Sequence, residues 1–116
     1  MTNNKYITEK FINAALEMNT KFLRQPWKTL WSNKYPLWGY CYVIAEVLYH
    51  YVLVDSVIMR VKVEAGWHWY LIYDNEIIDS VPPHIKIDYS TGIRGVFLTK
   101  EPSKRAKIFA NKVFTY

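Results

Sequence analysis

The sequence predicts a single α+β domain in which helices pack on a small antiparallel sheet. One observation is size, because 116 residues with 51% hydrophobic content suffice for one core of a common domain size. Another is the order of hydrophobic patterns: two helical periodicities, then three or four strand-like segments, then a final helical pattern. The sequence contains no internal repeat, low-complexity stretch or linker, so we expect one domain over residues 1–116.

The first helix is predicted over residues 7–24. Its apolar residues recur at helical spacings of three and four: Ile7, Phe11, Ala14, Ala15, Met18 and Phe22. Residues 25–36 contain two prolines and two tryptophans, which predicts an irregular, aromatic-rich connection.

A second helix is predicted over residues 40–52. Its apolar face recurs at steps of four, three and four through Cys41, Ala45, Leu48 and Val52. Cys41 therefore belongs to the core-facing stripe but stands at its N-terminal end, where a side chain can emerge into a cleft. His50 follows nine positions later, about 180° round a helix of roughly 100° per residue, so a partner for Cys41 must come from elsewhere.

Three strands are predicted next, over residues 55–64, 67–73 and 76–81. Residues 55–64 alternate between apolar and charged side chains, as a half-buried strand does. Asp74-Asn75 has the composition of a two-residue hairpin turn between the other two strands. Pro82-Pro83 ends the third strand, and residues 95–99 are expected to add one more short strand.

The last predicted helix covers residues 103–114, and this quarter of the chain also contains the excess positive charge. The net charge is +5, whereas residues 1–88 balance at nine basic and nine acidic side chains. From residue 89 onward Glu101 is the one acid, and six side chains are basic: Arg94, Lys100, Lys104, Arg105, Lys107 and Lys112. Such a basic patch is either a solvated helix face or a surface that meets nucleic acid or an acidic protein.

Cysteine usage and hydropathy predict a cytoplasmic protein. One cysteine excludes an internal disulfide, and the first ten residues contain no apolar signal-peptide core. The longest apolar run, residues 40–59, has the length of a membrane span. Glu46, His50 and Asp55 interrupt it, and charges at a bilayer centre are costly, so we expect a buried helix and a strand and no membrane segment.

Cys41 stands where a nucleophile would need to stand. A thiol attacks poorly until it becomes a thiolate, and the free N–H groups and dipole of a helix N-terminus favour the thiolate. The same N–H groups can hold the negative oxygen of a tetrahedral intermediate. Gly39, two residues earlier, permits a tight turn and leaves room for a substrate. The alternative is a buried structural cysteine, since free cysteine is among the most buried residue types.

His68 and Asp79 are predicted to meet on one face of the sheet. In a strand over residues 67–73, His68 and Tyr70 point to the same side. With a two-residue turn at Asp74-Asn75, Tyr70 lies opposite Asp79, which is then one diagonal step from His68 and within side-chain reach. Asp79 would hold the imidazole in one tautomer and stabilise its protonated form. A three-residue loop would place Asp79 on the opposite face of the sheet from His68.

Other interpretations remain open for the polar residues. His68, between two tryptophans, also fits a core histidine bonded to backbone, and His84, after two prolines, fits an ordinary loop residue. One cysteine and three scattered histidines do not match zinc-site spacings, so we expect no metal and no cofactor. Five aromatic side chains are expected to line a cleft around Cys41: Trp38, Tyr40, Trp67, Trp69 and Tyr70.

The chain order of these residues resembles the papain-like superfamily of cysteine enzymes, and within it the transglutaminase-like and arylamine-acetyltransferase-like arrangements. The matching residues are Cys41 in Gly-Tyr-Cys-Tyr, His68 in Gly-Trp-His-Trp and Asp79 in Ile-Ile-Asp-Ser. Residues 95–106 are also similar to small phage and bacterial proteins with this Cys, His and Asp pattern. The resemblance implies a papain-like or transglutaminase-like core and a catalytic triad. It departs in the short interval from His68 to Asp79 and in the lack of an evident Gln or Asn oxyanion donor ahead of Cys41.

Two functions are therefore expected as alternatives. The first is a small cysteine hydrolase or acyltransferase that acts on a peptide, isopeptide or amide bond of a protein, peptide or small acyl substrate. In it Cys41 attacks the carbonyl, His68 transfers the proton and Asp79 orients His68, without a cofactor. The second is a non-catalytic binding module, either a phage-type inhibitor of a host protein in the host cytoplasm or a nucleic-acid binder. It would use the basic C-terminal helix and an aromatic surface.

Overall fold

The structure, a computed structural model, describes residues 5–23 and 25–114. Its elements follow one another as α1 (Glu9–Met18), α2 (Trp27–Leu30), α3 (Cys41–Tyr51), β1 (Val57–Val63), β2 (Gly66–Tyr73), β3 (Glu76–Ile78), the 3₁₀ turn η1 (Tyr89–Thr91), β4 (Ile93–Arg94) and α4 (Lys104–Phe114). This is a small α+β domain with helices on an antiparallel sheet, as the hydrophobic patterns predict.

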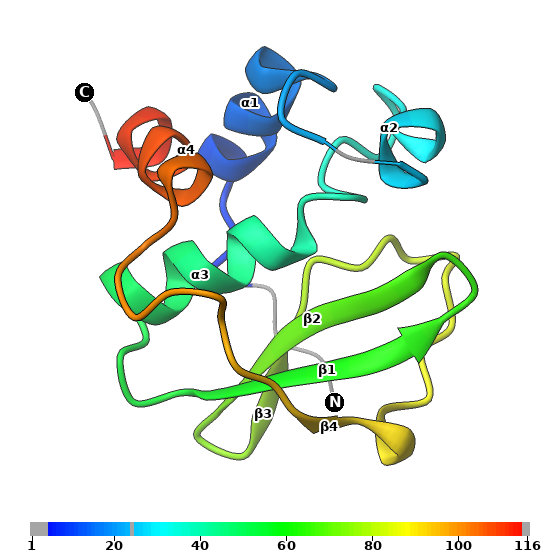
Figure 1. The fold of residues 1–116 in the computed structure, drawn as a ribbon, viewed down its shortest axis with the longest axis vertical. Coiled ribbons are helices and arrows are strands. Elements are labelled where there is room, and N and C mark those ends of the chain that lie inside the picture. The colour runs from blue at the N-terminus through cyan, green and yellow to red at the C-terminus, as the bar shows by residue number, and fades with distance from the viewer. Residues whose placement is uncertain (1–4, 24, 115–116) are drawn as a thin grey trace.

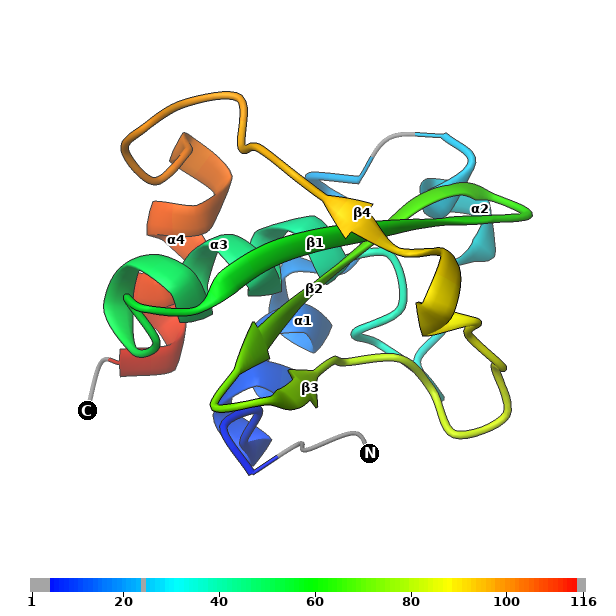
Figure 2. The ribbon, with the colours of Figure 1, turned by 90° about the horizontal axis from the view of Figure 1, so that it is seen from below.

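Helix α3 occupies the centre of the molecule. It runs between the sheet on one side and α4 on the other, with α1 packed beside α4 (Figure 1). Figure 2, from below, shows β1 and β2 crossing under α3. Seven of its eleven residues are buried: Cys41, Val43, Ile44, Ala45, Glu46, Val47 and Leu48. A helix that is apolar on most sides is covered on most sides, which is why α3 forms the core of this domain.

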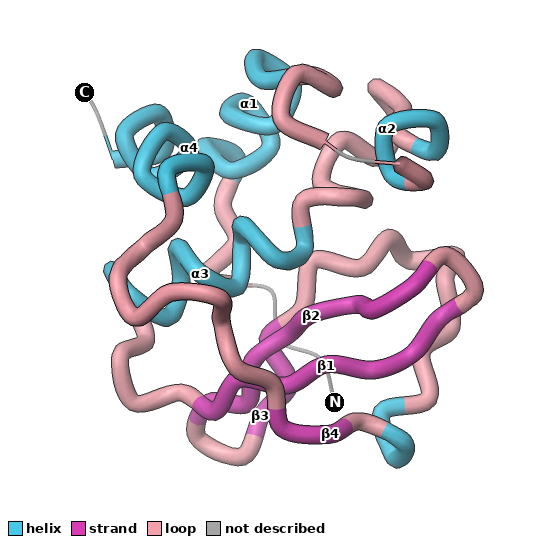
Figure 3. The backbone as a smooth tube through the Cα atoms, in the orientation of Figure 1, coloured by secondary structure: helices cyan, strands magenta, loops and turns pink. Residues whose placement is uncertain are grey.

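The sheet has the strand order β3-β2-β1-β4, and every neighbouring pair is antiparallel (Figure 3). Asp74 and Asn75 form the hairpin turn with φ angles of 51° and 63°, so Tyr73 pairs with Glu76. Positive φ at both positions is typical of the type I′ turn, and the predicted two-residue turn is confirmed. Because β3 is short, it pairs with β2 only from Leu71 to Tyr73.

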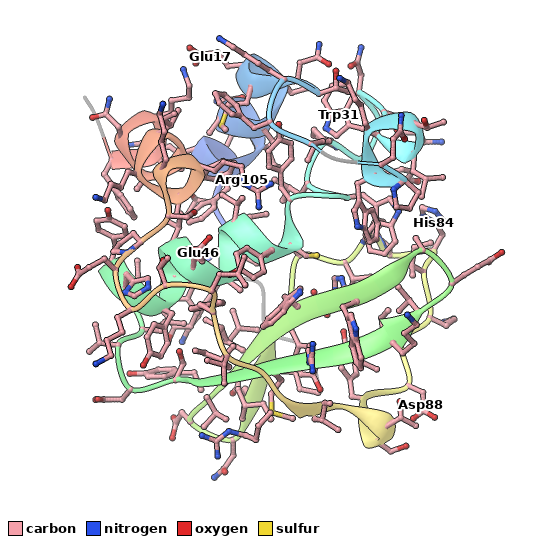
Figure 4. The ribbon with its side chains drawn as sticks, in the orientation of Figure 1. Glu17, Trp31, Glu46, His84, Asp88 and Arg105 are labelled. Carbon is pink, nitrogen blue, oxygen red and sulfur yellow. The ribbon has the colours of Figure 1, made fainter. Side chains whose placement is uncertain are left out.

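A buried carboxylate joins α3 to α4. Glu46 is fully buried, and its two oxygens accept hydrogen bonds from Ser103 N and Ser103 Oγ at 2.9 and 2.8 Å. Ser103 Oγ in turn accepts a bond from Ala106 N in the first turn of α4 at 3.2 Å. Figure 4 shows Glu46 on α3 and Arg105 on the neighbouring helix α4. Glu46, the acidic residue that interrupts the apolar run in the sequence, therefore holds Ser103, whose hydroxyl caps the first turn of α4.

Four predicted elements differ in the structure. The strand predicted over residues 76–81 ends at Ile78, so Asp79 directly follows it. The helix predicted over residues 7–24 is shorter, because Asn19 turns to φ 55° and closes α1 with a bond to Ala15 O; Arg24 lies outside the described residues. The strand predicted over residues 95–99 is wrong, since the chain pairs with β1 at Ile93–Arg94, and Gly95 N makes one further bond, to Ile58 O. The connection predicted to be irregular contains α2.

Candidate active site

The fold brings together Cys41, His68 and Asp79 from three different elements. Cys41 is the first residue of α3, His68 lies in β2, and Asp79 directly follows β3. His68 Nε2 lies 2.7 Å from Asp79 Oδ1, and both side chains are fully buried. The predicted contact between the two side chains is confirmed. The contact depends on the hairpin turn at Asp74 and Asn75, which sets the register of β3 on β2. This register places Asp79 just after β3, beside the part of β2 that β3 does not pair with.

The second ring nitrogen of His68 is left for Cys41. Nδ1 is buried and makes no hydrogen bond of regular geometry within the described residues. Burial by itself lowers the pKa of His68, but the hydrogen bond to Asp79 and the nearby Cys41 thiol outweigh it and raise the pKa to about 10. Because Nε2 is directed at Asp79, Nδ1 is the ring nitrogen that remains for a partner such as the Cys41 thiol.

Asp79 is held by more than the histidine. Its Oδ1 also accepts a hydrogen bond from Val81 N at 3.1 Å, and its Oδ2 accepts one from the hydroxyl of Tyr89 at 2.6 Å. The sequence analysis missed Tyr89. It lies ten residues beyond Asp79 in η1, and only the path of the intervening loop places it there. No local spacing signals such a contact.

Backbone N–H groups surround the thiol at the start of α3. The first hydrogen bond of this helix is Ile44 N to Tyr40 O, and no side chain caps the N-terminus. The amides of Cys41, Tyr42 and Val43 therefore have no backbone acceptor in the described part of the chain. Gly39 precedes them with φ +105°, a conformation that other residues rarely adopt. This arrangement can donate hydrogen bonds to an oxygen anion next to Cys41.

Trp38 covers the site. Its ring lies 5.4 Å from the His68 ring, centroid to centroid, and it packs edge-on against Trp27 at 4.9 Å. Cys41 is only 4% exposed as a result of this enclosure. The space around Cys41, Tyr70 and Asp79 holds about 10 Å³, which is too small for any substrate.

Two larger cavities meet at Trp38. The first, of about 240 Å³, is lined by residues 34–38 and 80–83, together with two apolar residues near the N-terminus. The second, of about 700 Å³, is lined by residues 62–65 and 85–88 and by Pro26 and Leu30. Trp38 lines both cavities and contacts His68, whereas Ile7 and Ser80 line both the first cavity and the small space around Cys41.

The predicted aromatic cleft needs correction. Trp38 contacts His68 as expected, but Tyr40 is fully buried, and its hydroxyl donates to Asn19 O while its ring packs on Phe109. Trp67 and Trp69 alternate with His68 along β2 and take the other face of the sheet, where Trp69 still lines the small space around Cys41 and Asp79 as predicted. Arg60 stacks on both of them, 4.1 and 5.8 Å from the two rings.

Tyr70, the fifth residue of the predicted cleft, is buried beside the triad. It packs on Tyr89, with ring centroids 5.0 Å apart. Burial raises its pKa, and so does the Asp79 carboxylate.

The remaining histidines lie away from Cys41. His84, labelled in Figure 4, lies in the loop after β3, and its ring packs on that of Tyr35 with the ring centroids 4.5 Å apart. His50 lies among the rings of Tyr49 and Phe97 near the other end of α3. Neither can serve Cys41 as a base.

The six basic residues do not form one face. Arg94 lies in β4, whereas Lys104 to Lys112 lie in α4 at a different side of the molecule (Figure 1). Arg105 donates to Phe22 O at 3.0 Å, and Lys112 pairs with Glu17 at 2.5 Å, so these two are bound to neighbouring helices and loops. Lys100, Lys104 and Lys107 are exposed.

The described residues contain neither a cluster of metal-binding side chains nor a membrane-spanning helix. Across residues 5–23 and 25–114 no group of three Cys, His, Asp or Glu side chains is arranged to hold a metal ion. None of the helices described here has the length and apolar character needed to cross a bilayer.

Comparisons with protein-family models, curated proteins and solved structures yield no match for this chain. The chemistry of the site must therefore be argued from the arrangement of its own residues.

Proposed function

We propose that the protein is a cysteine hydrolase or acyltransferase with Cys41 as nucleophile, His68 as proton carrier and Asp79 as the orienting carboxylate. One observation carries the proposal: a fully buried His68–Asp79 hydrogen bond at Nε2 leaves Nδ1 without a partner in the described residues, and the thiol of Cys41, at a helix N-terminus, is near enough to raise the pKa of the same ring. Burying a charged pair costs desolvation free energy, which good geometry and additional hydrogen bonds must offset. Strongly perturbed histidines next to a cysteine occur preferentially at functional sites.

The reaction follows from these positions. The pKa of His68, about 10, keeps its ring protonated at neutral pH, so His68 holds the proton of the Cys41–His68 pair, and the thiolate sulfur of Cys41 attacks the carbonyl carbon of an ester, amide or peptide. The amides at the start of α3 hold the oxygen anion that forms. His68 then protonates the leaving group, the bond to that group breaks, and an acyl thioester remains on Cys41. A water or amine activated by His68 attacks the thioester, takes the acyl group and restores the thiol.

The order of the three residues along the chain also supports the resemblance to papain-like and transglutaminase-like enzymes. Cysteine opens the central helix, histidine follows on a strand, and aspartate comes directly after the next strand. That order is the one which the resemblance implies. The acyl acceptor, water or an amine, is not fixed by these three residues.

Access to Cys41 requires Trp38 to move. The cavities on its two sides supply room for groups on either side of a scissile bond, and the indole now lies over the ring of His68. Gly39, directly after Trp38, is a natural pivot because it already adopts φ +105°. A small ester is therefore the first substrate to try.

The test uses p-nitrophenyl acetate with wild-type protein and the Cys41→Ala variant. The proposal predicts release of p-nitrophenol together with an acetyl group on Cys41, detected by the mass of the intact protein and of its peptides. His68→Ala should abolish acetylation, whereas His84→Ala, in an exposed loop, should retain it. Equal release by wild type and Cys41→Ala, with no acetylated Cys41, would overturn the proposal.

A second function is favoured by a separate observation, the exposed segment that connects β4 to α4. Val96 and Leu98 are 82% and 91% exposed, and Lys100, Lys104 and Lys107 follow them. Aliphatic side chains beside three lysines suit an acidic protein partner. Binding of an acidic polypeptide such as poly-glutamate that weakens steeply with salt and survives Cys41→Ala would support this function. Binding unaffected by replacement of the three lysines with alanine would exclude it.

A further inference from the structure

The carboxylate of Asp79 has more donors than a histidine partner requires. Within the described residues it accepts bonds from His68 Nε2, Val81 N and the Tyr89 hydroxyl, at 2.7, 3.1 and 2.6 Å. The first two share Oδ1, so Tyr89 alone holds Oδ2 in this part of the chain. The side chain of Asp79 is fully buried, and water has little access to satisfy an oxygen that loses its donor.

The position of Tyr89 is built by the elements around it. Asp88 begins η1, where its side chain accepts from Ser90 N at 3.2 Å. The ring of Tyr89 packs edge-on against Tyr70, and Gly92 closes the turn with a bond to Tyr89 O at 3.0 Å. A Cβ at Gly92 would lie 2.0 Å from the Tyr70 hydroxyl, so only glycine allows this close approach. These contacts fix the direction of the Tyr89 hydroxyl.

We propose that Tyr89 is a positioning residue of the Cys41 site, whose hydroxyl fixes the Asp79 carboxylate so that Oδ1 stays on His68 Nε2. The terminal torsion of an aspartate is soft, and a single hydrogen bond at Oδ1 leaves the carboxylate free to rotate. A second donor at Oδ2 removes that freedom and thereby fixes the plane of the imidazole. The effect of Tyr89 on catalysis rests on the proposed function, whereas its effect on the orientation of Asp79 and His68 does not.

The alternative is that Tyr89 only fastens η1 to the sheet. Both roles cost stability when the hydroxyl is removed, so stability cannot separate them. The proton affinity of His68 can, because it responds to the Asp79 carboxylate. The experiment therefore follows the His68 ring signals by NMR as a function of pH, in the full chain.

Tyr89→Phe removes the hydroxyl and keeps the ring, and Tyr70→Phe is the matched control on the neighbouring ring. Tyr89→Phe should lower the pH at which His68 titrates and slow alkylation of Cys41 by iodoacetamide about tenfold, as expected for one lost hydrogen bond to a charged group. Tyr70→Phe should leave both close to wild type. Titration of His68 at the wild-type pH in folded Tyr89→Phe, or at a higher pH, overturns the proposal.

A second variant covers the case in which Tyr89→Phe fails to fold. Asp88 is exposed at the start of η1 (Figure 4), so Asp88→Ala loosens Tyr89 without touching the core. A smaller change of the His68 titration in the same direction supports the proposal, and an unchanged titration contradicts it. Absence of acetylation in wild-type protein would remove the proposed function alone, because the His68 titration needs no substrate.

Discussion

His68 Nε2 and Asp79 Oδ1 lie 2.7 Å apart in the interior, although eleven residues separate them in the chain. The contact exists because a two-residue turn places Asp79 just past the end of β3, beside the part of β2 that β3 leaves unpaired. The contact determines which ring nitrogen of His68 remains for another partner. With Nε2 occupied, Nδ1 is the ring nitrogen that remains for the proton exchange with Cys41 that we propose.

The proton affinity of His68 depends on the charge of Asp79. In Asp79→Asn the carboxylate charge is lost while the shape of the side chain is kept, so the pKa of His68 should fall from about 10 toward its ordinary 6.5. The measurement is NMR titration of the His68 ring. Asp74→Asn in the hairpin turn is the matched control, and a fall of equal size there would point to a general charge effect.

The same titration makes the stability of the protein depend on pH. The folded-state pKa of His68, about 10, lies above its ordinary value of 6.5, so folding holds a proton that the unfolded chain releases. The stabilisation is complete below about pH 6.5 and is lost as the pH rises through 10. Urea unfolding across this range should show a falling free energy of unfolding. Asp79→Asn should flatten the decline, and an equally steep decline in that variant would contradict the assignment.

Trp38 should control access to Cys41. Trp38→Ala removes the indole that lies on His68, so alkylation of Cys41 should accelerate about tenfold, equivalent to roughly 1.4 kcal/mol less for local opening. Trp67→Ala, on the opposite face of the sheet, should leave the rate unchanged. Alkylation is followed by intact-protein mass. An unchanged rate in Trp38→Ala would show that access follows another route.

The core around α4 should be the most sensitive part of the fold. Phe109 is fully buried against Phe11 and Tyr40. Phe109→Ala should lower the free energy of unfolding by about 3–5 kcal/mol through lost burial and a cavity. Leu98→Ala is the control, because this side chain is 91% exposed and its loss should change stability by less than about 0.5 kcal/mol. Comparable losses in both would contradict the described core.

Strand alternation and turn chemistry suffice to predict the His68–Asp79 contact. Asp74-Asn75 tolerates the positive φ that a two-residue turn needs, and the parity of residues on both strands then follows. The helix of Cys41 is likewise predictable from apolar spacing, although its observed start is Cys41 itself.

Contacts made by loops lie beyond this reasoning. Tyr89 reaches Asp79 through the path of residues 80–88, and Trp38 reaches His68 through the turn at Gly39. Tyr40, predicted for the cleft, belongs to the core because the helix begins one residue later and turns its ring toward Phe109. Such positions depend on tertiary packing, which overrides local pattern.

Alkylation of the single cysteine tests the central claim most directly, because every adduct of iodoacetamide with a thiol then reports Cys41. The rate at neutral pH is compared between wild type, His68→Ala and the exposed-loop control His84→Ala. The account predicts that His68→Ala slows alkylation at least about tenfold, since the imidazole no longer stabilises the thiolate, while His84→Ala matches wild type. Equal rates in all three proteins, each shown to be folded, would contradict it.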